Sequence, residues 1–309
     1  DVDKYERHKQ QYELCRKTIT QIEDNLKPGE AVLYRDFVAQ YMCEGSKLSN
    51  LVFVVIWRGQ DGCKKIMKFN HLCADKDTRS QDAYFMADTW DFFLGKGDGH
   101  SDFLKREHIT KLYVSGDHGP HFSSIRTLWN ESTFYGRYGV CLHLFFLCSY
   151  HAYNRCDAAG LESKRIHATA IKTRGALPLV DELASALNES EYHNSVAVPL
   201  HEINRGANVF PVKLVENDAL DLRGKCEVKF DWTNEDGSIG RQDGVILCRD
   251  VPALPGQEGT LYEVYDLRHN QPEGSLCKYC SRLAQRPVRH KASGEGCPAI
   301  YSREKELAA

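Results

Sequence analysis

Apolar residues recur at two spacings along this chain, and the spacing separates helices from strands. Between Val2 and Leu26 they recur every three, four or seven positions among charged residues, which predicts a helix. β-Branched and aromatic runs predict strands at 30–37, 51–57, 63–69, 111–117 and 139–148. Helical spacing returns at 83–94, 123–130 and 157–172. The pattern therefore predicts an α/β domain.

Acidic residues follow two of these strands and begin the last of these helices. Asp36 lies at the end of the first strand, Asp117 at the end of the fourth, and Asp157 and Glu162 in the helix. If the first and fourth strands lie side by side in parallel, their carboxyl ends adjoin, and ligand sites of α/β sheets gather at such ends. Ordinary turn and helix-capping roles are the alternative for each Asp.

Three segments resemble signature segments of transposase-derived ribonuclease H-like proteins. They are Leu33-Tyr-Arg-Asp-Phe-Val-Ala-Gln-Tyr41, Ser115-Gly-Asp-His-Gly-Pro-His-Phe122 and Tyr150-His-Ala-Tyr-Asn-Arg-Cys-Asp-Ala-Ala-Gly160. The similarity covers roughly residues 27–174, and the order of the predicted elements agrees with that fold. Ala152-Tyr-Asn stands where the family has Gly-Lys-Gly, and His118 replaces a Gly. The resemblance implies a ribonuclease H-like mixed five-stranded sheet flanked by helices.

The same resemblance implies a chemistry for the acidic residues. Two Mg²⁺ (or Mn²⁺) ions held by carboxylates stabilise the attacking and leaving oxygens of a phosphodiester. Asp36, Asp117 and Asp157 are the expected ligands, and Glu162 competes with Asp157 for the third place. His121 and His151 are expected either to meet substrate phosphate and take part in proton transfer, or to be structural histidines.

Beyond a helix predicted at 178–188, short strands are expected at 225–232, 243–248 and 260–266, which suggests a small β-rich module. Cys277, Cys280, His290 and Cys297 then have spacings suited to a structural Zn²⁺ site, with His269 as an alternative to His290; free thiols on a loose tail are the other interpretation. Five neighbouring cationic residues suit contacts with phosphates: Lys278, Arg282, Arg286, Arg289 and Lys291. A charged tail that is only solvated is the alternative interpretation. We expect four parts: an N-terminal helix (1–26), the catalytic domain (27–190), the β-rich module (191–270) and the zinc-binding basic tail (271–309).

Composition narrows the class of protein. The 309 residues are 42% hydrophobic, enough for a large core. The formal net charge of -3 argues against nucleic-acid binding by bulk charge alone and leaves room for a local basic face. No apolar run approaches the roughly 20 residues of a membrane helix, and the charged opening lacks a signal-like apolar region. Twelve mostly scattered cysteines fit a reducing compartment, so we expect a nuclear or cytoplasmic protein without a membrane partner.

The resemblance, with the three acidic residues that match it, implies a transposase-like, metal-dependent nuclease or strand transferase that acts on DNA, and a homo-oligomer is compatible with it. One alternative is a domesticated, catalytically inactive relative that keeps the fold and binds nucleic acid or protein. Another is a ribonuclease H-fold exonuclease, which would use the same acids on free strand ends.

Overall fold

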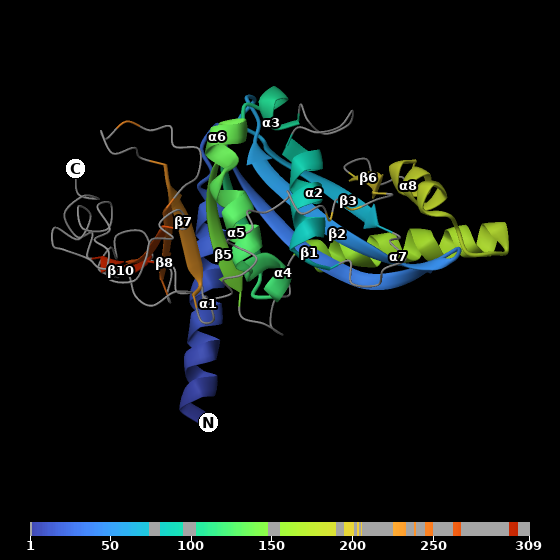
Figure 1. The fold of residues 1–309 in the computed structure, drawn as a ribbon. Coiled ribbons are helices and arrows are strands. Elements are labelled where there is room, and N and C mark those ends of the chain that lie inside the picture. The colour runs from blue at the N-terminus through green and yellow to red at the C-terminus, as the bar shows by residue number, and fades with distance from the viewer. Residues whose placement is uncertain are drawn as a thin grey trace.

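The computed structural model describes residues 2–73, 81–94, 103–147, 155–189, 195–200, 203, 205, 225–232, 238, 245–249, 262–266 and 297–301 (Figure 1). The helices are α1 (Val2–Asp24), α2 (Ala83–Leu94), α3 (Phe103–Arg106), α4 (Pro120–Ser123), α5 (Ile125–Ser132), α6 (Phe134–Tyr138), α7 (Arg155–Arg174) and α8 (Val180–Asn188). The strands are β1 (Glu30–Cys43), β2 (Ser46–Arg58), β3 (Lys64–Cys73), β4 (Lys111–Asp117), β5 (Cys141–Leu147), β6 (Ser195–Leu200), β7 (Glu227–Asp231), β8 (Val245–Arg249), β9 (Tyr262–Asp266) and β10 (Cys297–Tyr301).

One mixed, open sheet joins all these strands in the order β10-β9-β8-β7-β5-β4-β1-β2-β3-β6. At its centre β4 lies between β1 and β5 and is parallel to both, whereas β2 is antiparallel to β1 and to β3. The expected parallel pairing of the first and fourth strands is therefore confirmed. The expectation of a five-stranded sheet is wrong, because β6 adds to β3 and β7 adds to β5. The strands of the predicted β-rich module thus continue the central sheet, while the proposed domain boundaries stay predictions.

β1 is longer than its hydrophobic pattern indicates. It runs to Cys43 and turns at Glu44 and Gly45 into β2, with Cys43 paired to Ser46. Gly45 has a φ of +82°, which glycine adopts without strain. Asp36 therefore lies inside β1 and pairs with Val52 of β2, so its expected place at the end of a strand is wrong. The parallel pairing of β1 with β4, however, ends two residues before it, at Tyr34 and Ser115.

Alternation along β1 divides the core into two layers. Ala31 and Leu33 face one side, where they pack in a cluster with aromatic residues of α2 and with residues of α5 and α6. Val32, Tyr34 and Val38 face the other side, in a cluster with residues of α1, α7 and α8. Helices thus cover both faces of the sheet, as expected for an α/β domain. Figure 1 shows that the N-terminal half of α1 extends beyond the sheet. No helix in the ranges above is long and apolar enough to cross a membrane.

Gly160 brings α7 close to β1. A Cβ atom built on Gly160 would lie 2.6 Å from Cγ1 of Val38, closer than such atoms approach. We expect Gly160→Ala to lower the free energy of unfolding by about 1–3 kcal/mol, because the added methyl group overpacks this contact. Urea unfolding monitored by circular dichroism measures the change.

The control for this prediction is a double-mutant cycle with Val38→Ala. If the contact is the cause, Gly160→Ala should cost much less in a Val38→Ala background than in the wild type. Equal costs in both backgrounds would contradict the assigned cause.

Candidate functional site

The register of β1 and β4 brings two of the predicted acidic positions to one edge of the parallel pair. The paired residues run from Glu30 with Lys111 to Tyr34 with Ser115. Asp36 and Asp117 each follow the last pair by two residues, so strand alternation gives both the same side as Tyr34 and Ser115. This is the side covered by α1 and α7.

The beginning of α7 delivers Asp157 to this region. The thiol of Cys156, the residue before it, is buried and donates a hydrogen bond to the carbonyl oxygen of Val52 at 3.5 Å. Burial raises the pKa of this thiol well above its ordinary value, and the negative charges of Asp36 and Asp157 raise it further. Both carboxylates therefore lie close enough to act electrostatically on one sulfur atom.

Asp117 has a second role in the loop after β4. Its Oδ1 accepts a hydrogen bond from the backbone N–H of Gly119 at 2.9 Å, which fixes the turn into α4. Nε2 of His121 lies 3.7 Å from the same oxygen. The sequence-based alternative of a turn role for Asp117 is thus present in the structure, and its role as a metal ligand stays a prediction.

His121 is half-buried among aromatic rings beside Asp117. Its ring contacts Phe37 edge-on at a centroid distance of 4.8 Å, and Nε2 has no hydrogen-bond partner among the residues that the structure describes. Burial lowers the pKa of His121 to about 4; the negative charge of Asp117 opposes this shift and the positive charge of Arg35 adds to it. The imidazole is therefore neutral at pH 7.

This depressed pKa predicts how stability depends on pH. Between the ordinary His pKa of 6.5 and about 4, the unfolded chain binds a proton that folded His121 does not, so stability falls as the pH is lowered through this window. We expect His121→Phe to make the free energy of unfolding depend less steeply on pH in this range. The check is urea unfolding at a series of pH values. His143, whose pKa burial also lowers to about 4, is the comparison, and its substitution should remove a separate part of the slope.

Glu162, the competing third ligand, forms an ion pair with the third strand of the chain. Its Oε2 lies 2.6 Å from Nζ of Lys68 in β3, and both side chains are largely buried. In the same helix, Oγ of Ser163 donates to Oδ1 of Asn70 at 2.9 Å. These contacts give Glu162 a role in holding α7 against β3.

Carboxylate oxygens are the hard donors that Mg²⁺ prefers, so the chemistry of the three Asp residues fits the predicted metal. Within the part of the chain that the structure describes, however, no three His, Cys, Asp or Glu side chains form a group that could hold a metal ion. His151 and the tail residues Cys277, Cys280, His290, Arg282, Arg286, Arg289 and Lys291, with His269 and Lys278, lie outside the described residues. Cys297 is the first residue of β10.

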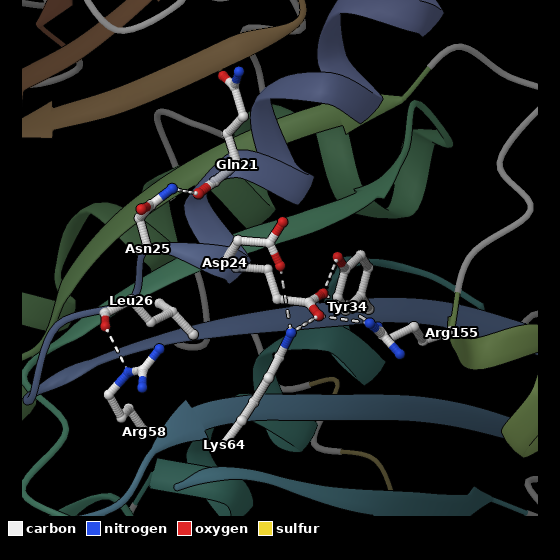
Figure 2. Close-up of polar contacts among 9 residues, drawn as sticks. Gln21, Asp24, Asn25, Leu26, Tyr34, Arg58, Lys64 and Arg155 are labelled. Atoms are coloured by element: carbon white, nitrogen blue, oxygen red, sulfur yellow. Dashed lines mark hydrogen bonds and ion pairs between the residues drawn. The ribbon is translucent and has the colours of Figure 1, made fainter. Parts of the chain in front are cut away.

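A group that sequence reasoning missed lies beside the carboxylate edge. Glu23, near the end of α1, accepts hydrogen bonds from the hydroxyl of Tyr34 at 2.8 Å and from Nη2 of Arg155 at 2.5 Å. Nζ of Lys64 approaches the same carboxylate at 2.5 Å. Figure 2 shows Tyr34, Lys64 and Arg155, from three different elements, pointing toward the end of α1.

Electrostatics keep Glu23 ionised. Burial alone would raise its pKa, but the hydrogen bonds from Lys64, Arg155 and Tyr34 outweigh burial and hold the pKa below its ordinary value. Conversely, burial and the charge of Glu23 raise the pKa of Tyr34. No sequence pattern indicates this group, because its members come from separate elements of the chain and each is an ordinary residue type for its helix or strand.

Beside this group, a cavity of about 440 Å³ lies between α1, the sheet and the first turn of α7. Its lining includes Arg16, Glu23, Tyr34, Ser115 and Arg155. Tyr34 and Ser115 precede Asp36 and Asp117 by two residues on the same face of the sheet. The cavity therefore lies next to the carboxylate edge along β1 and β4, although Asp36, Asp117 and Asp157 are not among the described residues that line it.

Comparison of the chain with models of known protein families and with curated proteins gives no match.

Proposed function

We propose that this chain is a ribonuclease H-like, metal-dependent nuclease or strand transferase that acts on DNA phosphodiesters. The observation that supports it best is the central strand order β3-β2-β1-β4-β5, with β1 and β4 parallel. This order agrees with the fold that the three signature segments imply. It also brings Asp36 and Asp117 to neighbouring strands on the side from which α7 contributes Asp157.

In this proposal Asp36, Asp117 and Asp157 would hold Mg²⁺ or Mn²⁺. The bound ions supply charge stabilisation for the attacking and leaving oxygens of the phosphodiester. Other residues of the chain position these carboxylates. Gly160 sets the distance of α7, and so of Asp157, from β1, and the hydrogen bond from Gly119 orients the side chain of Asp117. His121 is neutral at pH 7, because burial and the positive charge of Arg35 lower its pKa. A neutral imidazole beside Asp117 could accept a proton during the reaction.

The test is incubation of the purified chain with linear DNA, closed circular DNA and RNA, in Mg²⁺, in Mn²⁺ and with a chelator. Metal-dependent nicking or strand joining of circles supports the proposal. Progressive degradation of linear DNA that spares circles would support the exonuclease alternative. If the correctly folded protein cleaves none of these DNA and RNA substrates, the proposed nuclease activity is refuted.

A second candidate is a domesticated, inactive relative that binds nucleic acid or protein. It is favoured by the hydrogen bond from Gly119 to Asp117, which gives that carboxylate a structural reason to be present without a metal. In this case DNA binding would persist in a chelator and no cleavage would occur.

The carboxyl-terminal tail is proposed to bind Zn²⁺ through Cys277, Cys280, His290 and Cys297, and to contact phosphates through its cations. Elemental measurement of zinc in the purified protein tests the site, and a protein without zinc would refute it. A nuclear or cytoplasmic location and homo-oligomerisation complete the proposal. Fluorescence microscopy of the tagged protein and sedimentation analysis test them.

A further inference from the structure

The cavity beside α1 has the size and the chemistry of a ligand site. Its volume of about 440 Å³ falls in the range of roughly 300 to 1,000 Å³ that is usual for small-ligand pockets. Ile19 and Leu147 contribute apolar surface, and Tyr12 and Tyr34 contribute aromatic rings. A lining that is both aromatic and cationic suits a planar, apolar group attached to an anionic one.

A buried hydroxyl group without a partner lines this cavity. Ser115 is 1% exposed, and its Oγ makes no hydrogen bond to any residue within the described ranges. A buried polar group without a hydrogen bond costs about 1–3 kcal/mol, so its presence calls for an explanation. A ligand with a polar edge in the cavity would give Ser115 its missing partner.

The charges around the cavity favour an anion. Lys64 and Arg155 are partly neutralised by Glu23, as described above, and Asp24, which also lines the cavity, lies 3.7 Å from Nζ of Lys64. Arg16 also lines the cavity, is exposed, and makes no ion pair with any residue that the structure describes. The guanidinium group of Arg16 is therefore available to a phosphate, next to Lys64 and Arg155, which share the carboxylate of Glu23.

We propose that this cavity binds one nucleotide, with its phosphate at Arg16 and Arg155 and its base or sugar against Tyr34 and Ser115. The proposal rests on the proposed function, since Ser115 and Tyr34 lie two residues before Asp117 and Asp36 on the same face. A nucleotide held here is part of a strand that continues toward the carboxylates. Aromatic rings together with cations are the usual means by which proteins hold single-stranded nucleic acid.

The experiment measures binding of a fluorescently labelled oligodeoxythymidylate by anisotropy, in a chelator so that no metal contributes. We expect Arg16→Ala to weaken binding about tenfold, because it removes a charge-assisted contact. Ser115→Ala is expected to weaken binding about three- to tenfold through the loss of one hydrogen bond. Competition with thymidine monophosphate separates the two sources of the ligand: displacement indicates that a free nucleotide suffices, and no displacement indicates a nucleotide within a strand.

Two matched variants distinguish the cavity from general charge and from misfolding. Arg165→Ala removes one exposed positive charge elsewhere on α7 and should leave binding unchanged. Ala158→Leu narrows the cavity from an exposed helical position, so it should weaken binding without lowering the melting temperature. Ser115→Ala should melt at the wild-type temperature or above it, since its hydroxyl has no partner to lose.

The proposal is overturned if the wild type binds neither probe, or if Arg16→Ala and Ser115→Ala bind as tightly as the wild type. These outcomes differ from a failure of the proposed function. A chain that binds through Arg16 and Ser115 but cleaves nothing would support this nucleotide site and refute the proposed nuclease activity. If the chain cleaves DNA but both variants bind as tightly as the wild type, the proposed nuclease activity is supported and this nucleotide site is refuted.

Discussion

Asp117→Asn should lower the rate of metal-dependent DNA cleavage by roughly a hundredfold or more, because loss of even an indirect contact to a metal commonly costs 10- to 100-fold. The substitution is chosen to spare the fold. Asn keeps an oxygen that can accept the hydrogen bond from the backbone N–H of Gly119, which Asp117 accepts at 2.9 Å. The measurement is the initial rate of plasmid nicking in Mg²⁺, alongside the melting temperature.

The chain contains a matched control. Oδ1 of Asp61 accepts a hydrogen bond from the backbone N–H of Cys63 at 3.0 Å, two residues further on, in the same way as Asp117. Asp61→Asn therefore makes the same chemical change in the same kind of turn, in the loop between β2 and β3 and at none of the three proposed ligands; it also removes an exposed ion pair with Lys65 at 3.7 Å. If Asp61→Asn and Asp117→Asn reduce cleavage equally, or neither reduces it, Asp117 is only a turn residue. Asp36→Asn should reproduce the effect of Asp117→Asn.

The largest expected effect on stability concerns a buried ion pair on the opposite face of β1. Arg35 and Glu131 are 1% and 0% exposed and form an ion pair between β1 and α5. Nε1 of Trp90 donates to the same carboxylate at 3.1 Å, and the guanidinium of Arg35 lies 4.7 Å from the ring centroid of Phe122. Glu131→Gln should lower the free energy of unfolding by about 3–5 kcal/mol, because it leaves the charge of Arg35 buried and uncompensated.

The second variant tests that reason. In Arg35→Met combined with Glu131→Gln, no buried charge remains and Gln still offers an oxygen to Trp90. We expect this double variant to be more stable than Glu131→Gln alone, because an apolar replacement of a buried pair is often close to neutral. Urea unfolding gives both values. A double variant less stable than either single one would contradict the argument.

Two further measurements sharpen this prediction. Glu44→Gln, in an exposed ion pair with Arg174, should change stability by less than about 1 kcal/mol. Arg35→Met should raise the pKa of His121, because the charge of Arg35 contributes to lowering it. Titration of the His121 ring followed by nuclear magnetic resonance reports that shift even if stability is unaffected.

Local patterns were sufficient to predict most of the elements. The long helices α1, α2, α7 and α8 were expected within a few residues of their bounds, since one apolar face at helical spacing identifies a helix without knowledge of its partner. The strands β2 and β3 were also expected, at 51–57 and 63–69, and the loop that joins them contains Gly62 at a φ of +76°. The two faces of β1 follow directly from the alternation of its side chains.

Elements and contacts that depend on distant parts of the chain were not predictable in this way. β6 exists because it pairs with β3, more than a hundred residues earlier, and its own six residues carry little signal. β1 extends to Cys43 because β2 returns along it. Glu162 was expected as a possible ligand from its position in the helix, but Lys68 of β3, which holds it, cannot be inferred from the helix sequence.

By itself, the sequence determined the alternation of strands and helices and the positions of Asp117 at the end of β4 and Asp157 in the first turn of α7, because periodicity and turn residues are local properties. Only the tertiary structure decided that the sheet extends beyond five strands, that Asp36 lies inside a long β1, and that α1 closes a cavity over Tyr34 and Ser115. Hydrogen bonds between strands and the burial of Glu23 against Tyr34 and Arg155 join residues far apart in the chain. Such contacts are selected by the free energy of the whole fold.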